Sequence, residues 1–156
     1  MMEFFEDAPL KQRVAFLTVI AHLARADGNF DDDEKDFFID LAKLYKLSKD
    51  DARETIKIRT DDEVLDIVKN ITNKGLALVL IREMFYLGYE DGDLSDSEII
   101  FISKVGMTLG ISIDKMEEIS SWVIRGIEWE EEGDEIFYDF DEDEETTEID
   151  LNEFDL

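Results

Sequence analysis

The sequence predicts an all-α fold: a compact bundle of about seven helices with an internal two-fold repeat, followed by a disordered acidic C-terminal tail. Three observations lead to this prediction. Apolar residues recur at helical spacing over almost the whole body of the chain, and no segment has a convincing strand pattern. Proline occurs once and glycine eight times in 156 residues, too few for the tight turns of an all-β protein. The length suits one domain, and 44% hydrophobic residues suffice for its core.

The first two helices are predicted from about Pro9 to Ala26 and from about Asp32 to Lys46. Proline suits a first helical turn, where its missing N–H is not needed. The first helix has an apolar seam formed by Leu10, Val14, Leu17, Ala21 and Ala24. The second helix is expected to bury four large side chains, Phe37, Phe38, Leu41 and Leu44.

Two capping signals place the third and fourth helices. Ser48 is the expected N-cap of a helix from about Lys49 to Arg59. Thr60 and Glu63 form a capping box, in which the threonine oxygen accepts an early helical N–H and the glutamate accepts the N–H of the cap residue. The fourth helix then carries the apolar residues Val64, Leu65, Val68 and Ile71.

The fifth predicted helix, from about Gly75 to Glu90, is apolar almost all round, so we expect it to be central and buried on most sides. A second capping box, formed by Ser95 and Glu98, opens a sixth helix that ends near Leu109. Ser112 caps the seventh. The inward side chains of the seventh helix are expected to be Ile113, Met116, Ile119, Val123, Ile124 and Ile127.

A shift of 64 residues aligns one half of the body with the other. Residues 27–34 read DGNFDDDE, and residues 91–98 read DGDLSDSE. Farther along the chain, Ser48 aligns with Ser112 in the same register. The repeated unit is a helix, an acidic turn, a second helix and the start of a third. Two such units predict a pseudo-symmetric bundle.

The repeated motif resembles the TerB-like (tellurite-resistance protein B) family. That family shows Ala-Asp-Gly-x-apolar-x-x-x-Glu twice, and this chain contains ADGNFDDDE and EDGDLSDSE. The resemblance covers about residues 10–128 and implies an all-α fold and a role in bacterial tellurite resistance, stress response or phage defence. The second copy departs from the pattern with Glu90 in place of alanine. We therefore predict a TerB-like helical domain at 1–128 and an acidic-aromatic tail at 129–156, an extension whose role the family does not supply.

The two acidic turns are candidate sites for a divalent cation, with Ca²⁺ as the first candidate, because their donors are hard oxygens on short loops. The resemblance to the family also implies cation binding at these turns. The candidate ligands are Asp27, Asn29, Asp31 and Glu34 in the first turn, and Asp91, Asp93, Ser95 and Glu98 in the second.

Two comparisons limit the cation hypothesis. A standard EF-hand is excluded, because Asp32 stands where that loop needs glycine and Phe38 where it needs glutamate. Helix capping is the competing interpretation: Asp31 and Ser95 would cap the following helices, and Glu34 and Glu98 would close the capping boxes. The sequence leaves both interpretations open.

The charge is strongly acidic, with 42 acids against 16 bases and a formal net charge of −26. Such a surface repels nucleic acid and anionic lipid and attracts divalent cations or basic protein surfaces. The chain has no cysteine, and its start does not resemble a signal peptide, so we expect a cytoplasmic protein. The longest apolar run, at about residues 75–81, is far shorter than the roughly 20 residues of a membrane span. Membrane contact is expected only through a partner.

Residues 129–156 contain fifteen acids and no base. Like-charge repulsion favours a disordered, solvated extension. Large apolar residues nevertheless interrupt the charge, and such segments often order on a basic, apolar groove of a partner. We therefore predict a protein-binding motif that contains Phe137, Tyr138, Phe140, Ile149, Leu151, Phe154 and Leu156.

No sequence motif indicates catalysis, since the chain has no phosphate-binding loop, no HExxH and no recognisable catalytic triad. His22 is interpreted as a polar residue at the edge of the core, and Trp122 and Trp129 as packing anchors. The leading hypothesis is a non-catalytic scaffold, tuned by a cation. One alternative is an inhibitor whose acidic tail occupies a basic site by mimicking nucleic acid, and another is a metal-dependent hydrolase.

Overall fold

The computed structural model describes residues 5, 7–26, 30–90 and 92–138. Within these residues the chain is helical and contains no strand, which confirms the predicted all-α class. The helices are α2 (Leu10–Ala26), α3 (Asp32–Leu44), α4 (Lys49–Thr55), α5 (Asp61–Val68), α6 (Lys74–Glu90), α7 (Asp96–Thr108) and α8 (Ile113–Phe137).

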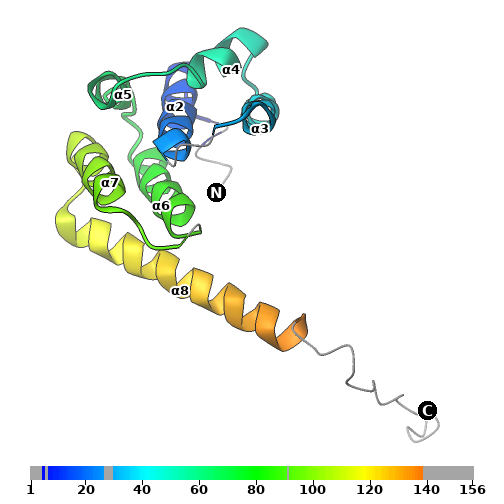
Figure 1. The fold of residues 1–156 in the computed structure, drawn as a ribbon. Helices are drawn as coiled ribbons and strands as arrows, with labels where there is room; N and C mark the ends of the chain where they lie inside the picture. Colours follow the sequence, from blue (N-terminus) through cyan, green and yellow to red (C-terminus); the bar gives the residue numbers. More distant parts are fainter. Residues whose placement is uncertain (1–4, 6, 27–29, 91, 139–156) are drawn as a thin grey trace, which may run out of the picture.

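Two long helices, α2 and α6, form the centre of the molecule (Figure 1). The first unit is built on α2, which packs against α4 and α5, while α3 packs against α4. In the second unit α6 packs against α7 and α8. Contacts of α2 with α6 and of α5 with α7 join the two units around one core. Its fully buried large side chains include Leu17, Leu23, Leu76, Leu80, Ile81, Met84 and Ile102.

The bounds of the helices confirm the internal repeat. A shift of 64 residues converts the printed bounds of α2 into those of α6, and the bounds of α3 into those of α7. It also converts the first residue of α4, Lys49, into the first residue of α8, Ile113. The units then diverge, because α4 ends at Thr55 and the chain turns into α5, whereas α8 continues without a break.

The predicted N-caps are all present, because they depend only on a few neighbouring residues. Ser48, Thr60, Ser95 and Ser112 each accept a hydrogen bond from the backbone N–H three residues later. Thr60 and Ser95 form complete capping boxes with Glu63 and Glu98. These bonds satisfy N–H groups that have no partner within the helix.

Part of the predicted core is wrong, because several apolar side chains face solvent. In α3, Phe38 is buried but Phe37 and Leu44 are 63% and 66% exposed. The reason is the position of α3 at the edge of the molecule, where only one of its faces is covered (Figure 1). Ile113, in the first turn of α8, is also exposed. The predicted packing anchors Trp122 and Trp129 are 56% and 75% exposed.

The first residues of the predicted tail are helical. Residues 129–137, expected to be disordered, continue α8 as a helix that extends away from the body (Figure 1). Glutamate is a good helix former and this stretch has no proline, so the helical preference of the residues outweighs the repulsion of their charges. The change of composition near residue 128 therefore lies within a helix. Residues 139–156 lie outside the part of the chain that the structure describes.

Candidate binding surfaces

The acidic turns serve first as helix caps. At the first turn, Asp31 Oδ1 accepts a hydrogen bond of 2.8 Å from the N–H of Glu34. At the second, Ser95 Oγ accepts the N–H of Glu98 at 3.2 Å, and Glu98 Oε1 accepts the N–H of Ser95 at 3.3 Å. The Ser95 hydroxyl lies 2.8 Å from the same carboxylate oxygen. The capping interpretation is thus confirmed for Asp31, Ser95 and Glu98.

Cation binding at these turns stays a prediction. Three of the candidate ligands, Asp27, Asn29 and Asp91, lie outside the described residues. Among the residues that the structure does describe, no three carboxylate or histidine side chains come together as a metal site would require. Asp93 is exposed beside Gly92, whose φ of 122° makes the chain turn sharply.

His22 lies at the edge of the core, as the sequence analysis interpreted it. Its Nε2 is 2.6 Å from Asp61 Oδ1, and its ring packs against Phe101 with centroids 5.2 Å apart. The first contact links α2 to the first turn of α5, and the second links α2 to α7. His22 therefore connects three helices.

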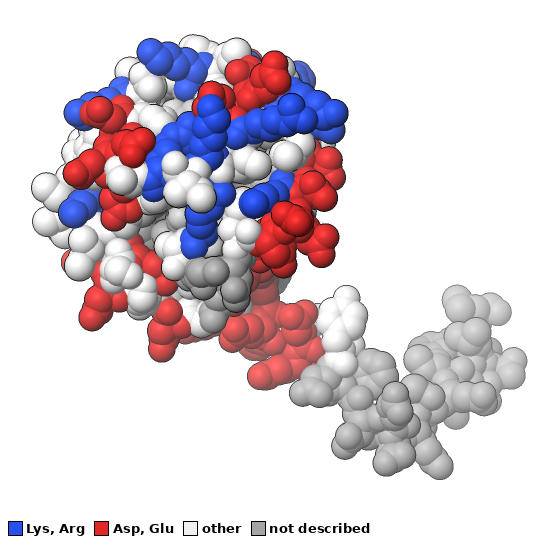
Figure 2. Space-filling view, turned by 45° about the horizontal axis from the view of Figure 1, so that its top comes forward, with Lys and Arg blue, Asp and Glu red and all other residues white. Residues whose placement is uncertain are grey.

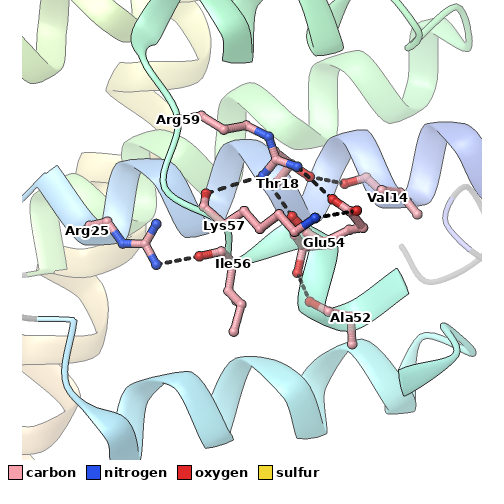
Figure 3. A network of polar contacts seen from close by, with 9 residues as sticks. Val14, Thr18, Arg25, Ala52, Glu54, Ile56, Lys57 and Arg59 are labelled. Atoms are coloured by element: carbon pink, nitrogen blue, oxygen red, sulfur yellow. Dashed lines mark hydrogen bonds and ion pairs between the residues drawn. The ribbon is translucent and has the colours of Figure 1, made fainter. Parts of the chain in front are cut away.

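Some of the basic side chains, with acidic ones among them, lie together on the face of the body that carries α4 and its link to α5 (Figures 1 and 2). Several of them hold backbone carbonyls of that link (Figure 3). Arg25 donates to the carbonyl of Ile56, and Arg59 donates to the carbonyl of Glu54 at 2.7 Å. Lys57 donates to the Glu54 carboxylate at 2.7 Å, and this hydrogen bond is the main reason that the pKa of Glu54 is lowered. The arrangement positions the turn between α4 and α5.

The end of α8 presents a different surface, which we call the acidic-aromatic end (residues 129–138). Four of its apolar side chains are exposed by 66% to 77%: Trp129, Ile136, Phe137 and Tyr138. Every charged residue in this stretch is acidic, as the projecting part of the molecule shows (Figure 2). Of the predicted partner-binding residues, Phe137 and Tyr138 thus lie on an accessible helix end. The others, Phe140, Ile149, Leu151, Phe154 and Leu156, lie outside the described residues.

A groove that the sequence analysis missed runs between α6 and α8. It has a volume of about 340 Å³, and we call it the α6/α8 groove. Its lining consists of Leu78, Val79, Arg82, Lys115, Glu118, Ile119, Trp122 and Arg125. Three bases against one acid make it locally positive on a chain of net charge −26. Two of these bases have acidic neighbours: Arg82 pairs with Glu83, and Lys115 lies 3.0 Å from Glu118.

Trp122 and Arg82 line both this groove and a second hollow of about 240 Å³. Tyr86 and Glu130 line the second hollow, and the Tyr86 hydroxyl donates to Glu130 at 3.4 Å. The pKa of Tyr86 is raised from its ordinary 10.0, first by burial and then by the nearby Glu130 carboxylate. The sequence signal for this surface was Trp122 itself, which lies one helical turn from Ile119 and Arg125 and two turns from Lys115.

Residues 13–121 match the family model described as tellurite resistance protein TerB. The chain belongs to the TerB family. The match includes both acidic turns and ends just before Trp122, so the second half of α8 lies beyond it. Neither the curated proteins nor the solved structures contain a match to this TerB-family chain. No helix among its described residues is long and apolar enough to cross a membrane.

Proposed function

We propose that this TerB-family chain is a non-catalytic interaction module of tellurite resistance or a related stress response. It binds a protein partner that has a basic surface, and the acidic-aromatic end of α8 makes the contact. Members of the family are generally not enzymes, which supports a role in binding.

The observation that carries the proposal is the exposure of large apolar side chains on an acidic helix end. Trp129 and Phe137 are 75% and 70% exposed on a stretch that has no base. Contiguous apolar surface in water is unfavourable, and where polar residues rim it, it commonly marks a protein-binding site. The surrounding carboxylates attract a basic partner over long range and repel acidic ones.

The test uses two isoleucines on the same helix. Ile136 lies in the acidic-aromatic end and is 66% exposed, and Ile113 lies in the first turn of α8 and is 73% exposed. A photo-crosslinking amino acid is placed at either position in the full chain, in the native host, and adducts are identified by mass spectrometry. We expect the adducts at position 136 to be enriched in basic proteins and to be absent at position 113. The same adducts at both positions, or none at 136, would contradict the proposal.

We propose separately that a divalent cation tunes this module at the two acidic turns. The exposed oxygens of Asp93 beside the turn at Gly92 support this, as does the strongly negative charge of the chain. Ca²⁺ should raise the melting temperature if it binds the folded chain better than the unfolded one. Asp27→Asn with Asp91→Asn should abolish the rise.

The matched control for the cation experiment is Asp32→Asn with Asp96→Asn. These two residues are related by the same repeat and begin α3 and α7, so the change in net charge is identical. The control should keep the rise in melting temperature. If both double variants lose it equally, the effect comes from general screening of charge, and the turns are not ligand sites.

A further inference from the structure

The α6/α8 groove has a counterpart in the first unit. A cavity of about 350 Å³ lies between α2 and α4, and the 64-residue shift relates its lining to that of the groove. Val14, Ala15, Thr18, Asp51 and Glu54 of the first cavity correspond to Leu78, Val79, Arg82, Lys115 and Glu118 of the groove. The same surface between two helices therefore exists twice in the molecule.

The cavity between α2 and α4 and the α6/α8 groove differ in the elements that border them. In the first unit, Ile67 of α5, together with Arg59 and Asn70 from the segments that flank this helix, forms a third wall. In the second unit, every lining residue belongs to α6 or α8, so the described part of the chain provides no third wall. The cause is the length of α8, which runs straight on where the first unit turns back into α5.

The groove is also more basic than its counterpart. Arg82 and Lys115 replace Thr18 and Asp51, and Arg125 stands where the first unit has Asp61. The element that completes the first unit, α5, combines acidic residues with the buried apolar residues Val64 and Val68. A segment of the same acidic and apolar kind would therefore complement the second groove in both charge and hydrophobicity.

The chain itself contains such a segment beyond α8. Residues 60–68 read TDDEVLDIV, and residues 147–156 read TEIDLNEFDL, again a threonine followed by acids interleaved with apolar residues. The length of the chain permits a return to the groove. Phe137 lies about 22 Å beyond Trp122 along the helix, and the residues from 138 to 149 can span about 36 Å.

We infer that the C-terminal segment, residues 147–156, docks in the α6/α8 groove of its own chain and provides the third wall that α5 provides in the first unit. Ile149, Leu151 and Phe154 cover the apolar floor beside Trp122. The acids of the segment lie among Arg82, Lys115 and Arg125. The inference concerns the groove, so partner binding by residues 129–138 can fail without affecting it.

The test takes advantage of the absence of cysteine from the chain. Asn152→Cys in the full-length protein carries a nitroxide spin label, and amide signals are compared before and after the label is reduced. The oxidised label should broaden the amide signals of Leu78, Ile119 and Trp122. Broadening should be absent on the face that carries α4, at Lys49 and Arg53.

Two substitutions test the basis of docking. Ile149→Ser with Leu151→Ser and Phe154→Ser lies outside the helical bundle in sequence and should remove the broadening while the amide signals of α2 and α4 stay in place. Arg82→Glu with Arg125→Glu should also remove it, whereas the equal charge change Lys49→Glu with Arg53→Glu should preserve it. Equal loss with both charge variants, or broadening centred on α4, would overturn the inference.

A mixed sample separates docking within one chain from docking between two. Isotope-labelled protein without the spin label is combined with spin-labelled protein at natural isotope abundance. Docking within the chain gives no broadening in this mixture. Broadening that persists in the mixture would assign the groove to the tail of a second copy and overturn the inference, as would the absence of broadening in every sample.

Discussion

At the scale of single residues, Lys46 adopts the left-handed conformation with a φ of 64°. Gly110, its counterpart in the second unit, has a φ of 73°. Both residues follow the end of a helix, where the next N–H reaches back to a helical carbonyl: Leu47 to Ala42, and Ile111 to Gly106, each at 2.9 Å. This is the hydrogen bond of a Schellman motif, which favours glycine at the left-handed position.

Lys46→Gly is therefore expected to stabilise the protein. Relief of the left-handed backbone should exceed the greater entropy of glycine in the unfolded chain by about 0.5 kcal/mol. The free energy of unfolding in urea measures the effect. Gly110→Lys is the reciprocal control and should destabilise, and a loss of stability in Lys46→Gly would show that the lysine side chain contributes more than its backbone costs.

Glu54 gives a prediction about pH. Lys57 first, and then Arg59, lower its pKa below the ordinary 4.5. A carboxyl group with a lowered folded-state pKa stabilises the fold above pH 4.5, and this contribution is lost as the pH falls through the folded-state value. Glu54→Gln should therefore be slightly less stable than the wild type at neutral pH and equally stable in acid. Lys57→Met should reduce the difference, which urea denaturation at several pH values measures.

At the scale of helices, Gly106 lies against a neighbouring side chain, whereas Gly126 lies on an open helix face. A Cβ added at Gly106 of α7 would lie 2.4 Å from Met116 Sδ of α8, whereas one added at Gly126 of α8 would meet nothing within 4 Å. At position 106, glycine leaves room for the end of the Met116 side chain. At the other it only weakens a helix.

Gly126→Ala should stabilise α8 by about 0.5–1 kcal/mol, since alanine favours the helix. Gly106→Ala gains the same helix preference but must displace the end of the Met116 side chain, so it should be about 1 kcal/mol less stable than Gly126→Ala. Thermal unfolding monitored by circular dichroism measures both. Similar effects of the two substitutions would contradict the assignment of Gly106 to a packed contact.

At the scale of the whole molecule, Gln12 connects the two units. It is 9% exposed, and its Oε1 accepts the backbone N–H groups of Thr72 and Asn73 at 3.2 and 3.1 Å. Its Nε2 donates to the Thr72 hydroxyl at 3.0 Å. Asn73 in turn accepts the N–H of Leu76, so the start of α6 depends on this connection.

Gln12→Ala should cost about 2–3 kcal/mol, because it leaves partly buried N–H groups without an acceptor. Thr72→Val, which removes only the hydroxyl, should cost about 1 kcal/mol. Urea denaturation measures both free energies. If Gln12→Ala cost no more than Thr72→Val, water would be replacing the glutamine, and the two units would be held together by the apolar core alone.

The sequence by itself determined the helices, their caps and the repeat. Caps such as Ser48 and Ser95 depend on residues within four positions, and apolar spacing marks each helix locally. The 64-residue shift, predicted from the two acidic turns, also relates the bounds of α2 to those of α6 and the bounds of α3 to those of α7. For the same reason, the capping role of Glu98 could be predicted, although its rival role as a cation ligand could not be decided.

Only the tertiary structure decided which apolar residues are covered. Phe37 and Phe38 are equally apolar, but α3 lies at the edge of the molecule, and Phe38 is buried while Phe37 is 63% exposed. Trp122 was predicted to be a packing anchor, but α8 runs straight on and Trp122 lies 56% exposed at the α6/α8 groove. Exposure depends on which elements pack against a helix, and that depends on contacts between residues far apart in the chain. Periodicity within one helix carries no information about those contacts.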